Sequence, residues 1–214
     1  MAAYQKWLLF ERACWLRGME NFLLDLAADR PFAEWLLDRI TDYQVAVAQR
    51  CIAAGVDCGR TGDDWGTQRG MLFSPTLWRA LIRPRLARVW AVYQEAGLPV
   101  LHHSCGDIQP IIGDLVEMGL TILHPLQAMM PRAALKAAYG DRLVFYGGID
   151  CQGVVPVGTP EEVRAEAREA IRTLGARGGV VIGLTHTLTS ETPLENVWAL
   201  WKTVQEERVH LAQG

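Results

Sequence analysis

The stretch Val100-Leu101-His102-His103-Ser104-Cys105-Gly106-Asp107 decides how this chain of 214 residues is interpreted. It begins as a short apolar run and ends in a polar turn, a pattern typical of a buried strand. Four other short runs end in the same way, and we predict them as strands: 56–61, 121–124, 143–146 and 180–184. The chain therefore has at least five predicted strands.

Helical patterns separate the predicted strands. Apolar residues recur at helical spacing over 32–53, which predicts one long helix. Capping residues and prolines open five more helices, at Ser74, Asp107, Met130, Thr159 and Thr192. This alternation predicts a parallel sheet with right-handed crossovers, whose functional groups gather at the carboxyl ends of the strands.

The number of strands limits the fold class. A complete eight-fold barrel takes about 250 residues, whereas this chain offers five strands, or six if 7–11 is one. We therefore predict an α/β fold of the (β/α)8 TIM-barrel type that is incomplete and lacks its amino-terminal part. The prediction treats 1–214 as a single domain.

Composition narrows the function classes. Half of the residues are apolar and the net charge is −3, which excludes disorder and gives no general attraction to nucleic acid or an anionic membrane. The five cysteines are scattered and form no CxxC pair, so a reducing compartment is expected. No segment resembles a signal peptide or a membrane span. We predict a cytoplasmic protein.

The first candidate site lies at the end of the run 100–103. Because side chains alternate along a strand, His103 and Cys105 face the same way, and an imidazole and a thiol so placed can share one zinc ion. A third ligand must come from elsewhere, and His186, just after the last predicted strand, is the natural candidate. The alternative is that His103 is a hydrogen-bonded core histidine and Cys105 a small buried residue.

The second candidate site follows the run 56–61. Asp63 and Asp64 could serve as a general base, as an anchor for a cationic or N–H-bearing substrate, or as metal ligands. The alternative is that one aspartate caps the next turn and the other pairs with Arg60 or Arg69. Trp65 could line a substrate pocket or fill the core.

The third candidate site is Tyr146-Gly147-Gly148-Ile149-Asp150, after another predicted strand. Its glycines allow the backbone to approach a ligand closely, and Asp150 presents a carboxylate just beyond them. An ordinary tight turn, in which Asp150 bonds its own backbone, explains the same residues. Both interpretations stay open.

Taken in order, four segments carry a family resemblance. They are Gly62-Asp63-Asp64-Trp65-Gly66, His103-Ser104-Cys105-Gly106-Asp107, Tyr146-Gly147-Gly148-Ile149-Asp150, and His186 followed by Glu191-Thr192-Pro193-Leu194-Glu195-Asn196. With these segments the chain resembles the uroporphyrinogen decarboxylase superfamily, which also contains zinc methyltransferases that move methyl groups between corrinoid proteins and thiols. The family fold is a (β/α)8 barrel, and the resemblance covers its carboxyl-terminal two thirds.

The methyltransferase branch of this superfamily is the activity that we expect. There an H-x-C pair and a later cysteine bind zinc; His103 and Cys105 match the pair, and His186 stands at the later position. The resemblance implies Zn²⁺ held by these three residues, a corrinoid methyl donor that is free or bound to a corrinoid protein, and a thiol acceptor whose pKa the zinc lowers. Asp63, Trp65 and Asp150 would contact the substrate.

The decarboxylase branch is the alternative. It uses no metal, and its histidine matching His186 lies near the substrate carboxylates, so His186 and Asp63 become the catalytic residues for decarboxylation of a tetrapyrrole in porphyrin biosynthesis. A further alternative is a non-catalytic chain that binds a tetrapyrrole or a partner subunit. In every case the unpaired strand edges of a partial barrel predict self-association.

Overall fold

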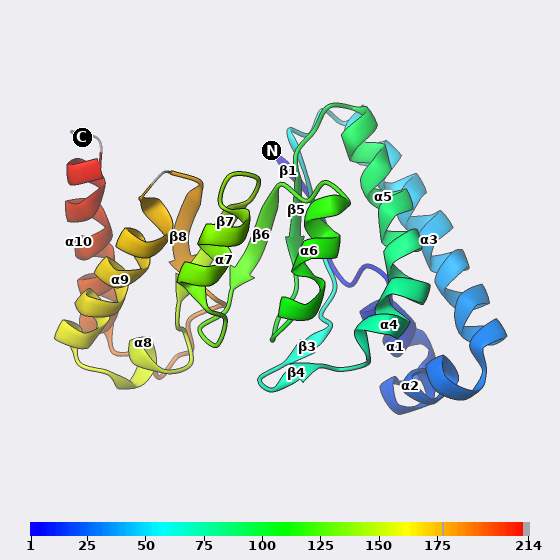
Figure 1. Ribbon diagram of the computed structural model, residues 1–214, viewed down its shortest axis with the longest axis horizontal. Coiled ribbons are helices and arrows are strands. Elements are labelled where there is room, and N and C mark those ends of the chain that lie inside the picture. The colour runs from blue at the N-terminus through cyan, green and yellow to red at the C-terminus, as the bar shows by residue number, and fades with distance from the viewer. Residues whose placement is uncertain (177, 212–214) are drawn as a thin grey trace. The chain divides into compact units, whose positions relative to one another are not determined.

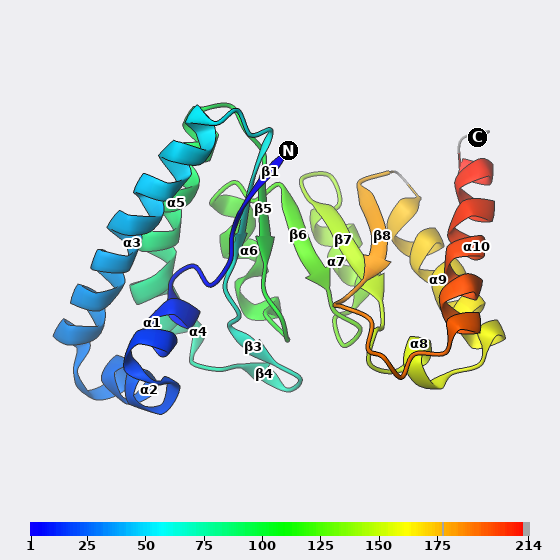
Figure 2. The same ribbon diagram turned by 180° about the vertical axis from the view of Figure 1, so that it is seen from behind.

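The computed structural model describes residues 1–176 and 178–211 (Figures 1 and 2). The chain divides into two compact units, Met1–Ile122 and Leu123–Gly214. Each unit is described by itself below. No helix in the described ranges has both the length and the apolar character needed to cross a membrane.

The first unit is built around three parallel strands. They are β1 (Ala2–Gln5), β2 (Cys58–Gly62) and β5 (Val100–His103), in the order β1-β2-β5. The register sets Gly59 opposite Val100 and Gly62 opposite His103. The carboxyl ends of β2 and β5 therefore lie side by side, as the parallel prediction requires.

The sixth strand lies earlier in the chain than predicted. The prediction that 7–11 forms a strand is wrong, because β1 ends at Gln5 and α1 (Phe10–Arg17) already begins at Phe10. Trp7, with φ of 55°, turns the chain between the two elements. The apolar run from Trp7 to Phe10 misled the prediction, since its last residue packs as the first turn of a helix rather than as a strand.

Seven further helical or hairpin elements complete the first unit around its strands, and α3 and α5 run alongside one another (Figures 1 and 2). In chain order they are α2 (Met19–Ala28), α3 (Arg30–Ala53), the hairpin β3 (Gly66–Thr67) and β4 (Gly70–Met71), α4 (Pro75–Leu77), η1 (Trp78–Ile82), α5 (Arg83–Glu95) and α6 (Gln109–Glu117). Ser74 caps α4 by accepting a hydrogen bond from the Leu77 amide. The helix predicted to open at Ser74 therefore does so, and a π-helical turn interrupts it.

The second unit repeats the strand–helix alternation. Its strands are β6 (Ile122–Leu126), which begins at the last residue of the first unit, β7 (Val144–Ile149) and β8 (Val180–Leu184), in the order β6-β7-β8. The helices are α7 (Arg132–Tyr139), α8 (Val154–Val157), α9 (Pro160–Gly175) and α10 (Leu194–Leu211). Thr159 and Glu162 form the capping box that opens α9, and buried Ile149, Val163 and Ala199 belong to the core. The predicted α/β class with parallel strands is confirmed.

Candidate active site

The turns after β2 and β5 form the candidate active site of the first unit. The Asp63 amide donates to the His103 carbonyl at 2.9 Å, and the Gly66 amide donates to the Cys105 carbonyl at 3.2 Å. A Cβ added to Gly106, whose φ is 81°, would overlap the backbone of Gly66. Only glycine at position 106 lets the two turns approach this closely.

His103 and Cys105 come together as the alternation of side chains predicted. The Nε2 atom of His103 lies 3.3 Å from the Sγ atom of Cys105. The His103 side chain is buried, and Cys105 is half-buried. Asp64 joins the pair, because its Oδ1 atom lies 3.4 Å from His103 Nε2 and accepts a hydrogen bond of 2.7 Å from the Cys105 amide. An imidazole, a thiol and a carboxylate thus meet at one strand end.

Asp63 lies inside the protein and holds α1. Its carboxylate is fully buried and accepts hydrogen bonds from the Phe10 amide at 2.8 Å, the Glu11 amide at 2.9 Å and the indole nitrogen of Trp65 at 3.0 Å. Burial raises the pKa of Asp63 to about 6, although these hydrogen bonds oppose the rise. The carboxylate predicted to contact substrate therefore caps the first turn of α1.

The alternative interpretation of the two aspartates, in which one of them pairs with Arg60 or Arg69, is wrong. In the described ranges Asp63 and Asp64 form no ion pair with Arg60 or Arg69; the Arg60 guanidinium lies over the Tyr4 ring, 4.2 Å from its centroid. The cap that Asp63 provides serves a helix some fifty residues earlier rather than the next turn. The two neighbouring carboxylates have opposite environments because one points into the core and the other toward the His103–Cys105 pair.

Trp65 packs in the core rather than at a surface. It is fully buried and stacks on the His102 ring, with centroids 4.6 Å apart. His102 is held by the Thr61 hydroxyl, 2.8 Å from its Nδ1 atom, and burial lowers the pKa of His102 to about 3. His102 is therefore a neutral core histidine, and Trp65 has the packing role that the sequence left open for it.

Glu11 is a site residue that the sequence analysis missed. Carried by the first turn of α1, its Oε2 atom accepts a hydrogen bond of 3.1 Å from the Asp64 amide. Burial, followed by the charges of Asp63 and Asp64, raises the pKa of Glu11 to about 7. The signal was an acidic residue at a helix start, which the strand predicted over 7–11 concealed.

Asp150 lies directly after β7 in the second unit. Its Oδ1 atom accepts a hydrogen bond of 2.9 Å from the Gln152 amide, as in the tight turn predicted for it as an alternative. It also lines a cavity of about 650 Å³ together with Arg132, Glu166 and Glu169. Arg132 donates to the Gly148 carbonyl at 2.6 Å, so this arginine fixes the glycine turn that precedes Asp150.

His186 lies two residues beyond β8, at the carboxyl end of that strand. The preceding Thr185 amide donates to the Ile149 carbonyl at 2.9 Å, which ties this turn to the end of β7. His186 is exposed. Its part in a metal site with His103 and Cys105 stays a prediction.

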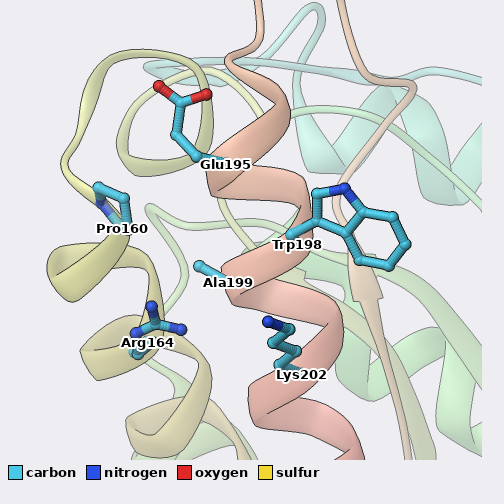
Figure 3. Close-up of a pocket in the computed structure, with 6 residues that line it drawn as sticks. All are labelled: Pro160, Arg164, Glu195, Trp198, Ala199 and Lys202. Atoms are coloured by element: carbon cyan, nitrogen blue, oxygen red, sulfur yellow. The ribbon is translucent and has the colours of Figure 1, made fainter.

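A second cavity of the same unit, of about 520 Å³, lies between α9 and α10. Figure 3 shows Arg164 of α9 and Ala199 and Lys202 of α10 among the residues that line it. No residue that the sequence predicted for a site lines this cavity.

Parallel strands alternating with helices, and polar groups beyond the carboxyl ends, define an α/β chain of the TIM-barrel type. Two solved structures agree with this fold. A methyltransferase from Methanosarcina mazei has a TM-score of 0.76 at 22% identity, covering 96% of this chain and 58% of the other. A B12-independent methionine synthase from Shewanella sp. W3-18-1 has a TM-score of 0.56 at 16% identity, covering 83% and 57%.

The sequence comparison defines the family. The family model for uroporphyrinogen decarboxylase matches residues 10–207, so the chain belongs to the uroporphyrinogen decarboxylase family. A uroporphyrinogen decarboxylase from Thermus thermophilus is 27% identical over 80% of this chain and 48% of the relative. The methylcobamide:CoM methyltransferase MtaA from Methanosarcina barkeri is 26% identical over 86% of this chain and 55% of the relative. The chain spans about half the length of these curated relatives, which are enzymes of two kinds.

Proposed function

We propose that the protein transfers a methyl group from a corrinoid donor to a thiol, with zinc held by His103, Cys105 and His186. The observation that carries this proposal is the distance of 3.3 Å between His103 Nε2 and Cys105 Sγ. Tetrahedral zinc with bonds of about 2.1 and 2.3 Å separates two such ligand atoms by about 3.6 Å. The pair therefore fits one zinc ion with a shift of a few tenths of an ångström.

The relatives supply the substrate classes of this proposal. The Methanosarcina barkeri relative is named for methyl transfer between a methylcobamide and CoM, and a Methanosarcina mazei relative that is 25% identical is named for transfer between a methylated thiol and coenzyme M. For this chain they support a methylated corrinoid, free or on a corrinoid protein, as donor and a thiol as acceptor.

Each residue of the site would have its own role. His103, Cys105 and His186 would hold the ion, which lowers the pKa of a bound thiol so that its thiolate is present at neutral pH. Asp64 would fix the turn that carries the two first-unit ligands, through its hydrogen bond from the Cys105 amide. Asp150 would orient the substrate from the second unit.

Decarboxylation of a tetrapyrrole is the second candidate function. The Thermus thermophilus relative favours it, and so does a histidine at position 186, where the methyltransferase resemblance has a cysteine. In that case His186 would act near the substrate carboxylates, and Glu11 or Asp64 would accept hydrogen bonds from pyrrole N–H groups. This candidate requires no metal.

Metal content separates the two candidates. We expect about one zinc per chain in protein purified without added metal, loss of that zinc in Cys105→Ser, and full zinc in the matched control Cys51→Ser, since Cys51 lies on α3 and is half-buried like Cys105. With Co²⁺ as the probe, a thiolate-to-cobalt absorption band should appear in the wild type and vanish in Cys105→Ser. Zinc well below one per chain, unchanged by Cys105→Ser, would refute the methyltransferase proposal and favour the decarboxylase.

A further inference from the structure

We propose that Glu11 and Asp64 make this site selective for positively charged ligands, so that the methyl acceptor is an aminothiol rather than an anionic thiol. The acceptor class rests on the proposed methyl transfer, whereas the charge selection is a property of the first unit alone.

The two carboxylates lie next to the His103–Cys105 pair. Asp64 touches both members, with its Oδ1 atom 3.4 Å from His103 Nε2 and 2.7 Å from the Cys105 amide nitrogen. Glu11 adjoins Asp64 through the hydrogen bond of 3.1 Å from the Asp64 amide. Asp64 keeps 34% of its side chain exposed, so a ligand at the thiol can reach it.

The Tyr4 phenol, on β1, lies near the same charges. Burial raises the pKa of Tyr4 most, the Arg60 charge lowers it, and the negative charges of Asp64, Glu11 and Cys105 each raise it further. Both carboxylates and the thiol are therefore close enough to the Tyr4 phenol to act on its charge.

The two carboxylates have no lysine or arginine partner in the described ranges. Neither Glu11 nor Asp64 forms an ion pair there with a lysine or an arginine, and Asp64 pairs only with His103. Two cations lie nearby and contact aromatic rings instead: Arg60 lies over the Tyr4 ring, 4.2 Å from its centroid, and Lys6 lies over the Trp7 ring at 4.8 Å. A cation that enters beside Cys105 would meet two carboxylates, whereas an anion would be repelled by both.

The raised pKa of Glu11, about 7, agrees with this crowding. Burial raises it most, Asp63 and Asp64 raise it further, and the hydrogen bond from the Asp64 amide and the Lys6 charge lower it. The Cys14 thiol and the Tyr4 phenol also lie near this carboxyl. A bound cation favours the ionised form of Glu11, so by linkage selection for cations should strengthen as the pH rises through about 7.

The electrostatic potential at Cys105 can be measured on protein from which a chelator has removed any metal. Two methanethiosulfonate reagents share a two-carbon spacer and differ in charge, one ending in an ammonium and the other in a sulfonate. Each reacts with the Cys105 thiolate to form a mixed disulfide and release methanesulfinate, and peptide mapping assigns the label to Cys105. The ratio of the two rates, divided by the ratio for 2-mercaptoethanol, reports the local potential.

We expect the cationic reagent to be favoured at least tenfold, since one carboxylate at about 6 Å and an effective dielectric of about 40 changes a rate about tenfold. Glu11→Gln and Asp64→Asn should each lower the ratio severalfold, and the exposed control Glu20→Gln should leave it unchanged. A wild-type ratio near one, or a ratio unaffected by both site variants, would overturn the inference.

The binding of small charged thiols tests whether the charge selection extends to the methyl acceptor. In titration calorimetry of the zinc-loaded protein, cysteamine should bind at least tenfold more tightly than 2-mercaptoethanesulfonate, and Glu11→Gln should narrow the difference. Tighter binding of the sulfonate would refute the charge selection alone. A chain that takes up no zinc but still prefers the cationic reagent would refute the proposed methyl transfer and retain the charge selection.

Discussion

Removing the Asp63 carboxylate should lower the free energy of unfolding, because hydrogen-bond donors of the first unit would lose their acceptor. In Asp63→Ala three donors lose their acceptor: the buried Phe10 amide and Trp65 indole, and the partly buried Glu11 amide. Each buried donor left unsatisfied costs about 1–3 kcal/mol, so the three together cost about 6 kcal/mol.

An opposing effect reduces this cost. Burial raises the pKa of Asp63 from the ordinary 3.8 to about 6, and each unit corresponds to about 1.4 kcal/mol. The ionised carboxylate therefore costs the folded state about 3 kcal/mol at neutral pH, and the alanine variant escapes that cost. The lost hydrogen bonds are the larger effect, and we expect Asp63→Ala to lower the free energy of unfolding by roughly 3 kcal/mol at pH 7.

The stability lost in Asp63→Ala should depend on pH. Because the folded pKa of Asp63 is raised, the stability that this group contributes is present below about pH 4 and is lost as the pH rises through about 6. The difference between wild type and Asp63→Ala should therefore be larger at pH 5 than at pH 7.

Urea unfolding followed by far-ultraviolet circular dichroism at both pH values measures this difference. Asp64→Ala is the matched control, and it should cost about 1 kcal/mol because that carboxylate accepts one short amide hydrogen bond and is partly exposed. Equal losses of unfolding free energy in Asp63→Ala and Asp64→Ala would refute the reasoning. A difference between wild type and Asp63→Ala that grows with rising pH would refute it too.

Three other substitutions or titrations have definite expectations. Gly106→Ala should lower the free energy of unfolding by several kcal/mol in urea unfolding. A Cβ at this position would overlap the Gly66 backbone, and the φ of Gly106 is one that other residues rarely adopt. Arg132→Met should lower the free energy of unfolding by about 2 kcal/mol in the same assay, since two glutamates of α9 lose a partly buried counter-ion; a loss below 1 kcal/mol would contradict this. The rate ratio for charged reagents at Cys105 should rise between pH 6 and 8 as Glu11 ionises, and Glu11→Gln should show no such rise.

Much of the fold followed from local patterns. Strand β8 has the predicted bounds, and the helix starts at Thr159 and Ser74 follow their capping residues. Caps and apolar runs are local signals, so a single sequence displays them. The first strand did not follow, because Ala2–Gln5 is a short edge strand whose place depends on pairing with β2, and pairing partners far apart in the chain leave no local pattern.

The candidate site was predictable to the extent that it depends on one strand. Alternation along β5 correctly brought His103 and Cys105 together. Alternation could not assign the two aspartates after β2, because their environments depend on where α1 docks. Glu11 was missed for the same reason, since it reaches Asp64 across more than fifty residues of chain.

The two neighbouring aspartates show how stability and site chemistry depend on each other. Asp63 faces the core and binds the first amides of α1, and that first turn carries Glu11 to the Asp64 amide. The buried carboxylate thus creates the exposed negative charge indirectly, by holding the helix that brings the second acid. A variant that frees α1 should therefore lower the charge selection at Cys105 severalfold even though Asp64 stays in place, because Coulomb attraction falls as Glu11 moves away and water enters between the charges.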